Sequence, residues 1–272
     1  MGEEKQDLEF AEQFAQSECS NSYRIIIPSR KRLKAIRRSG VDLFPTATIV
    51  VGESEQHEYA EIVGSDRVVT HPNLLGYTKI FNWCQKHFKE ECLFFVDDDV
   101  KDVRTTFPKP RHLKAKGIQQ IIENAIQAIT DLDLTVCCFS RTPNWSIIDP
   151  FNSPIVPVQF ATVGFGVRGA ARRRVSDESL MGRADMDWGL RTLRDDRCVY
   201  ADIRYFFDNG TIFGGEGGNV GLIDEEHRKT ITEKIEKRWG KYVPKGRIGF
   251  RKNQSVVALR MKVPRSNPTA LK

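Results

Sequence analysis

Short apolar runs alternate with amphipathic segments through the first 140 residues of this chain. The runs are four or five residues long, rich in Ile, Val and Phe, and show no helical period, so each predicts a buried β-strand. Strands are expected at residues 23–27, 47–51, 67–70, 92–96 and 135–139. Helices are expected between them: after residue 30, around 57–62, at 77–88 and at 118–129. This alternation predicts an α/β fold, with a Rossmann-like, mostly parallel sheet flanked by helices.

The second half of the chain is less regular. Residues 141–159 are rich in Pro, Asn, Ser and aromatic residues, which predicts a long ordered loop of the kind that lines a site. The strand expected at 160–167 contains Gly164 and Gly166, which indicates that something approaches its backbone closely. The remaining elements expected are a helix at 187–194, a strand at 200–207, a mobile glycine-rich loop at 214–219 and a charged helix at 224–239.

The length and composition favour one soluble domain. The chain has 272 residues, of which 40% are hydrophobic and 29% charged, and it shows no internal repeat or linker. We expect a polar leader at 1–21, a single α/β domain at 22–248 and a basic tail at 249–272. An acidic N-terminus without an apolar core argues against a secretory signal, and no apolar stretch is long enough to span a membrane. Six cysteines without CxxC spacing are expected to be buried thiols in a reducing compartment, so a cytoplasmic location is expected.

The positive charge is unevenly distributed. The net charge is +6, and basic residues gather at 30–38, 109–116 and 172–174. Such clusters fit a polyanion, either nucleic acid or the diphosphate of a nucleotide. A solvated basic surface is the alternative interpretation.

Three consecutive carboxylates, Asp97, Asp98 and Asp99, follow the apolar run at 92–96. They would repel one another unless a cation lay among them, and ligands of open α/β sheets bind at the carboxyl ends of strands. Oxygen ligands suit Mg²⁺ or Mn²⁺, which also bind substrate phosphates. The pattern therefore predicts a metal-bridged phosphate site, with a solvated acidic turn as the alternative.

Three segments together resemble the GT-A-fold nucleotide-sugar glycosyltransferases of the DxD type. They are Pro28-Ser29-Arg30 after the first strand, Asp97-Asp98-Asp99 after the fourth, and residues 184–191 at the start of a helix. The resemblance covers roughly residues 23–239. It implies an enzyme that moves a sugar from a nucleotide-sugar donor, expected to be a UDP-sugar, to a hydroxyl group.

The resemblance also implies roles for individual residues. Asp97 and Asp99 would bind Mn²⁺ or Mg²⁺, with Asp208 as a further metal ligand. Asp98 would contact ribose or sugar hydroxyls, and the donor's base and ribose would lie against four residues: Pro28, Ser29, Arg30 and Glu53. A turn at residues 208–210 is the alternative role for Asp208.

A carboxylate must accept the proton of the acceptor hydroxyl in a direct displacement, and Asp185 and Asp187 are the candidates. Ala184 stands where the family usually has an acid, so the choice between the two stays open. Capping of the following helix is the alternative for either residue. Inversion at the anomeric carbon is expected, because a base is present and no second nucleophile is evident.

The acceptor is inferred from a narrower likeness. Segments at 51–59 and 94–99 are similar to glycosyltransferases of modified-base pathways, the TET/JBP-associated enzymes found in bacteriophages, which glycosylate hydroxymethylated pyrimidines in DNA. A flipped base would then stack on Trp145 or Trp188. Three alternatives remain: a glycosyltransferase acting on a surface polysaccharide or lipid carrier, a Mg²⁺-dependent nucleotidyltransferase, and a DNA-binding module without activity. The sugar and the oligomeric state are left open.

Overall fold

The structure is a computed structural model that describes residues 22–106, 109–140, 155–156, 163–209, 222–241, 248–251 and 254–257. The leader at 1–21, Trp145, the loop at 214–219 and most of the tail lie outside the described residues. No helix in the described part of the chain is both long and apolar enough to cross a bilayer.

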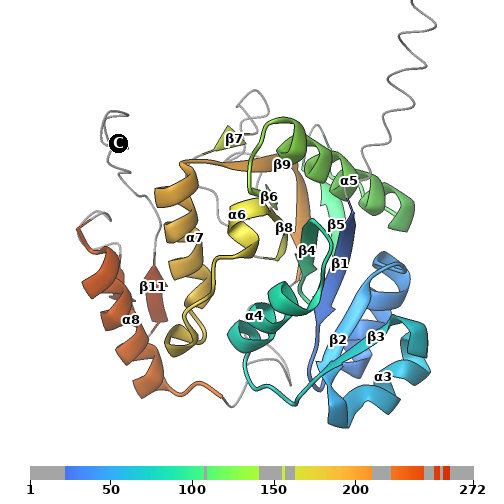
Figure 1. Cartoon of the computed structure of the whole chain (residues 1–272), viewed down its shortest axis with the longest axis horizontal. Coiled ribbons are helices and arrows are strands. Elements are labelled where there is room, and N and C mark those ends of the chain that lie inside the picture. Colours follow the sequence, from blue (N-terminus) through green and yellow to red (C-terminus); the bar gives the residue numbers. More distant parts are fainter. Residues whose placement is uncertain are drawn as a thin grey trace, which may run out of the picture.

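A nine-stranded sheet forms the centre of the molecule (Figure 1), in the order β3-β2-β1-β4-β8-β6-β9-β5, with β7 paired to β9. Its strands are β1 (Tyr23–Pro28), β2 (Thr48–Gly52), β3 (Val68–His71), β4 (Cys92–Val96), β5 (Asp102–Thr105), β6 (Val136–Ser140), β7 (Ile155–Val156), β8 (Gly164–Arg168) and β9 (Val199–Asp208). The pairings make β1, β2, β3, β4, β6 and β9 run in one direction, and β5, β7 and β8 in the other. The predicted mostly parallel α/β sheet is confirmed.

Helices cover both faces of the sheet. They are α2 (Leu33–Ile36), the π-helix η1 (Arg37–Leu43), α3 (Gln56–Val63), α4 (Tyr77–His87), α5 (Ala115–Asp131), α6 (Gly169–Arg172), α7 (Ala184–Asp196) and α8 (Glu225–Trp239), with short 3₁₀ turns η2 (Glu53–Glu55), η3 (Ser65–Arg67) and η5 (Glu178–Leu180). Alternate strand residues bury toward opposite faces, so Ile26 packs with α4 and α7 while Ile25 and Ile27 pack with α3 and α5. The result is a three-layer α/β/α domain.

The expectation of a close approach at β8 is confirmed. A Cβ atom added to Gly164 would lie 2.9 Å from the Phe207 ring, and one added to Gly166 would lie 2.6 Å from Cys137 Sγ. Larger residues there would collide with the side chains of Phe207 on β9 and Cys137 on β6. The glycines therefore let β8 insert, antiparallel, between β4 and β6.

Other elements were not predicted. β5 contains a single buried apolar residue, Val103, and becomes a strand through its pairing with β9. Helix α7 begins at Ala184 rather than at 187, and the strands β10 (Ile248–Arg251) and β11 (Gln254–Val257) form an antiparallel hairpin that contacts α8. Residue 249, where the basic tail was predicted to begin, lies within β10, which contacts α8.

Candidate active site

The carboxyl ends of β1 and β4 are joined by a buried polar network. Ser29 Oγ donates to Asp98 Oδ2 at 2.6 Å and lies 2.9 Å from the hydroxyl of Tyr59, which accepts from the backbone N–H of Arg32 at 3.0 Å. Because the Ser29 hydrogen goes to Asp98, the Tyr59 hydroxyl is the donor to Ser29. Arg32 Nη1 donates to Asp98 Oδ1 at 2.7 Å. Asp98 is 6% exposed, and these protein groups occupy both of its oxygens.

The hydrogen bonds of this network bear on the donor-binding roles predicted for Ser29 and Asp98. Sequence reasoning assigned both to the donor, whereas here their side chains bind each other and Arg32. Their contact with the donor stays a prediction, and the structure shows that they hold the two strand ends together. The basic cluster was visible in the sequence, but the pairing of Arg32 with the aspartates and the bridging role of Tyr59 were not.

Tyr59→Phe tests this network. The change removes the buried hydrogen bonds of the Tyr59 hydroxyl to Ser29 and to the backbone N–H of Arg32, so the free energy of unfolding should fall by about 1–2 kcal/mol. Urea denaturation followed by circular dichroism measures this. An unchanged midpoint would show that the network does not stabilise the strand ends.

Asp97 and Asp99 lie on a turn just beyond β4. The backbone N–H of Asp97 bonds to the Val163 carbonyl at 3.0 Å, and Arg32 Nη1 donates to Asp99 Oδ2 at 2.9 Å. The chain turns at residues 98–99, so the alternation of side chains along β4 ends at Val96, and Arg32 reaches both Asp98 and Asp99. Burial raises the pKa of Asp97 well above its usual range, and the charges of Asp99, Asp98 and Asp185 raise it further, against Arg32.

The turn is suited to a cation. Among the described residues, Asp99 Oδ1 is buried without a hydrogen-bond partner, and the negative charge around Asp97 exceeds what Arg32 offsets. No three His, Cys, Asp or Glu side chains in the described part of the chain converge to hold a metal by themselves. A divalent ion here would therefore need further ligands from a substrate or from water, as Mg²⁺ commonly does.

Helix α7 separates its two acidic residues. Asp187 is fully buried: its Oδ1 accepts from Arg238 Nη1 at 2.8 Å and from Trp239 Nε1 at 2.9 Å, and its Oδ2 lies 3.0 Å from Arg191 Nε. Asp185 is exposed in the first turn of α7, and its negative charge helps to raise the pKa of Asp97. Asp187 thus joins α7 to α8, whereas Asp185 stays exposed.

Two residues that sequence reasoning missed border Asp185. Tyr77, at the start of α4, has its pKa raised far above the usual value by burial and by nearby charges that include Asp97 and Asp185. Arg183 is half-buried just before Asp185 in the sequence. Its pKa is lowered, mainly by burial and further by the charge of Arg228, against the opposing effect of Asp185. Neither residue belongs to a recognisable motif, so only the packing of α4 against α7 identifies them.

The other predicted residues are dispersed. Pro28 is buried in the β1–β2 pairing, Arg30 is half-buried just after it, and Glu53 is exposed at the end of β2, where its charge acts on His71. Asp208 Oδ2 pairs with Arg104 Nη2 at 2.9 Å on the β5–β9 edge. The structure gives Asp208 an ion pair there, and its role as a metal ligand stays a prediction.

The expectation that Trp188 stacks a flipped base is wrong. Its ring is 3% exposed, packs against Phe81 and Phe165, and donates from Nε1 to the Arg174 carbonyl at 3.1 Å. A ring buried in the core cannot receive a ligand. Trp145 lies outside the described residues.

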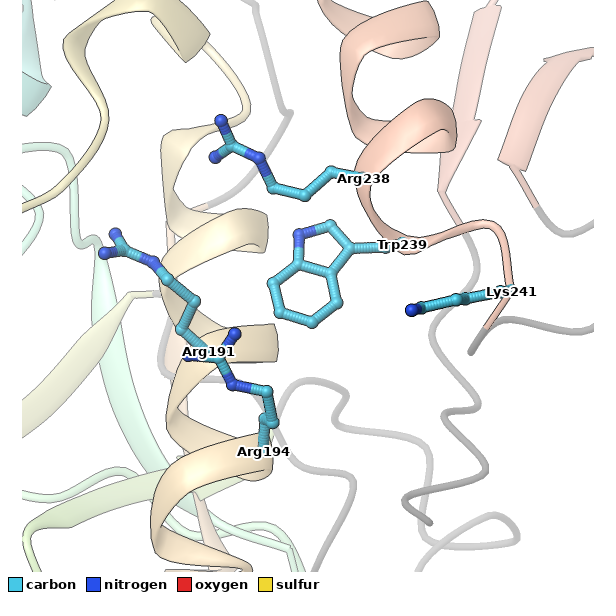
Figure 2. Close-up of a pocket in the computed structure, with 5 residues that line it drawn as sticks. All are labelled: Arg191, Arg194, Arg238, Trp239 and Lys241. Carbon is cyan, nitrogen blue, oxygen red and sulfur yellow. The ribbon is translucent and has the colours of Figure 1, made fainter.

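A pocket of about 370 Å³ lies between α7 and α8. It is lined by Arg191, Arg194, Arg238, Trp239 and Lys241 (Figure 2). Arg191 and Arg238 hold Asp187, Arg238 also pairs with Asp177, and Arg194 pairs with Asp195. None of the aspartates of the β4 turn, nor Asp185, lines it. The pocket belongs to the α7–α8 junction, where most of its cations already have acidic partners.

The mostly parallel sheet, with carboxylates beyond β4 and at the start of α7, is the arrangement expected of a GT-A fold. The sequence model of the TET-associated glycosyltransferase family matches residues 23–205, from β1 into β9. The match spans well over half of the chain, so the chain belongs to this family.

Solved structures resemble the fold at low sequence identity. Glucosyl-3-phosphoglycerate synthase from Mycobacterium tuberculosis, in complex with Mn²⁺ and UDP-glucose, superposes with a TM-score of 0.51 at 9% identity, covering 88% of this chain and 86% of that one. S. aureus TarS 1–349 (TM-score 0.46, 13% identity) and the mannosyltransferase PcManGT from Pyrobaculum calidifontis (TM-score 0.49, 13% identity) each match 79% of this chain. The chain spans 65% of the former and 64% of the latter. No curated protein sequence matches the chain.

Proposed function

We propose that this chain is a metal-dependent glycosyltransferase that moves a sugar from a UDP-sugar to the hydroxyl of a hydroxymethylated pyrimidine in DNA. The observation that carries the proposal is that the negative charge of Asp185, at the start of α7, acts on Asp97 in the turn beyond β4. Asp98 and Asp187 are buried and paired with protein cations, which leaves Asp97, Asp99 and Asp185 as the carboxylates that we assign to the site.

The donor would bind at the β4 turn. Asp97 and Asp99 would hold Mn²⁺ or Mg²⁺, which when bound neutralises charge on the departing nucleoside diphosphate. The buried Asp99 Oδ1 and the excess negative charge at Asp97 support this assignment. The complexes of glucosyl-3-phosphoglycerate synthase with Mn²⁺ and UDP-glucose, and of PcManGT with GDP-Man and Mn²⁺, involve the same classes of metal and donor.

On the acceptor side, Asp185 would accept the hydroxyl proton as general base. Its exposure, which a group that meets a large acceptor needs, and the effect of its charge on Asp97 support this role. The family description, TET-associated, and the net charge of +6 favour an acceptor in DNA.

Transfer from radiolabelled UDP-glucose to duplex DNA containing hydroxymethylcytosine tests the proposal. We expect label in the hydroxymethylated duplex and not in the same duplex with unmodified cytosine. Transfer should require Mn²⁺ or Mg²⁺ and stop with EDTA. UDP-galactose, UDP-N-acetylglucosamine and GDP-mannose should be assayed in parallel, because the sugar is not specified.

Thermal denaturation separates donor from acceptor. UDP together with Mn²⁺ should raise the melting temperature more than either alone, because both would bind the folded state at one site. A metal-dependent UDP shift without transfer to any hydroxymethylated DNA would reject the acceptor and keep the donor. No shift and no transfer with any donor would reject both.

A further inference from the structure

Two basic runs that are far apart in sequence meet in the fold. Arg38 Nε, in η1, donates to the Lys101 carbonyl at 2.6 Å, and α5 packs against η1. The segment after β5 runs back along that strand, since Leu113 N–H bonds to the Val103 carbonyl at 2.7 Å and leads into α5 beside it (Figure 1). Five exposed cations from the two runs, with Lys101 between them, therefore form one surface, the basic face: Lys34, Arg37, Arg38, Lys101, Lys114 and Lys116.

The basic face has little compensating charge. Among the described residues of 31–46 and 101–120, Asp42 is the one exposed acid. Asp102 is half-buried and pairs with His112 at 2.6 Å. Such an excess of one sign, spread over several elements, attracts a polyanion rather than a single small ligand.

The third basic run has a different role. Arg172 donates to the carbonyls of Gln85 and Phe88 at 2.8 Å, and Arg174 bonds to Thr192 at 2.6 Å and to Asp196 at 2.9 Å. These guanidinium groups hold α6 and α7 to the rest of the domain. Of the three basic runs in the sequence, two build the basic face and one stabilises the fold.

The basic face adjoins the candidate active site. Ser39 Oγ, next to Arg38 in η1, donates to the Asp98 carbonyl at 2.7 Å, and Lys101 lies two residues after Asp99. The π-helix creates this contact: its wide turn closes with Phe44 N–H on the Ser39 carbonyl at 2.9 Å, and Arg67 Nη2 donates to the carbonyls of Gly40 and Phe44. A strand bound on the face would pass close to the aspartate turn.

We propose that the basic face binds the phosphodiester backbone of the acceptor DNA and holds the duplex while a base enters the active site. The inference rests on the proposed function for the identity of the acceptor. It adds the surface that binds the duplex, which neither the family match nor the active-site carboxylates specify. Contacts to phosphate carry no sequence information, so binding should not depend on hydroxymethylation.

Fluorescence anisotropy with a labelled, unmodified 20-bp duplex tests the basic face apart from catalysis. The charge-reversed variant is Lys34→Glu, Arg37→Glu, Lys114→Glu and Lys116→Glu, and its matched control is Lys86→Glu, Lys89→Glu, Lys229→Glu and Lys234→Glu, all exposed and on other elements. Arg38 is kept because it bonds to the Lys101 carbonyl. A second variant with Gln at the same four positions removes the charge without reversing it, and thermal melts check that each protein folds.

We expect the charge-reversed variant to bind the duplex about 100-fold more weakly than wild type. The slope of log K against log salt concentration should become shallower by about 3–4. The affinity of the control variant should change by less than threefold. The Gln variant should lie between them. The KM for the UDP-sugar should stay within twofold, and the KM for the DNA acceptor should rise. Equal affinities and slopes for wild type and variant, or no binding by wild type in 50 mM salt, would overturn the inference. If the charge-reversed variant loses DNA binding, the basic face is supported. If, in addition, wild type transfers no sugar to hydroxymethylated DNA, the proposed acceptor is rejected.

Discussion

Replacing Asp97 and Asp99 together by Asn is expected to lower the rate of sugar transfer by about a thousandfold, or roughly 4 kcal/mol of transition-state stabilisation. Both carboxylates are the proposed metal ligands, and Asp99 Oδ1 is buried without a hydrogen-bond partner among the described residues. Removing them removes the negative charge that would bind the divalent ion. Steady-state assays with UDP-glucose, together with Mn²⁺ titration calorimetry in the presence of UDP, measure the two effects.

The same double variant should fold as well as the wild type when metal is absent. The charges of Asp99, Asp98 and Asp185 oppose ionisation of Asp97, so neutral Asn side chains relieve repulsion. Its melting temperature should therefore equal or exceed that of the metal-free wild type, and the gain from UDP with Mn²⁺ should disappear. Asp42→Asn, an exposed acid in η1, is the matched control. Unchanged turnover and unchanged Mn²⁺ affinity in the double variant would remove the basis of the proposed function.

Asp185→Asn is expected to lower activity and Asp187→Asn to lower stability, although the residues lie two positions apart on one helix. Asp185→Asn should lower kcat by 10²- to 10⁴-fold, the range for loss of a general base, with little change in the KM for the donor. Its side chain is exposed, so stability should change little. Single-turnover kinetics at saturating donor isolates this effect from binding.

Asp187→Asn should instead destabilise the fold by about 3–5 kcal/mol. The change leaves Arg191 and Arg238 without the buried carboxylate that they share, and weakens the acceptor of the Trp239 indole N–H. Urea denaturation measures this loss, and activity at low temperature should persist in the folded fraction. A stable Asp187→Asn protein without activity, beside an active Asp185→Asn protein, would reverse the assignment of the base.

The alternation of apolar runs was sufficient to predict the sheet and its main helices. A buried strand such as β4 is apolar on both faces, and an amphipathic helix such as α5 shows its stripe locally, so neighbouring residues carry the information. β5 could not be predicted in this way, because its residues become a strand only by pairing with β9. The start of α7 was misplaced by three residues, since Ala184 and Asp185 show no apolar period.

The candidate site, like the fold, was predictable from the sequence only in part. Three aspartates after an apolar run, and two more in the segment at 184–191, are visible in the sequence because strand ends and helix starts are local features. Which of them face the site depends on burial and on partners distant in sequence. Asp98 is held by Ser29 and Arg32 from the region of β1. Asp187 is held by Arg238 and Trp239 of α8, which follow it by 51 and 52 residues.

Local pattern thus established the class of fold, the position of the aspartate turn and the presence of three basic runs, because each depends on residues next to one another in the chain. Tertiary packing decided that Asp187 is buried while Asp185 stays exposed, that Trp188 belongs to the core, and that Arg38 meets Lys101 while Arg172 and Arg174 bind within the domain. The physical reason is that burial and electrostatic pairing are properties of contacts between distant segments, and such contacts exist only once the chain has folded.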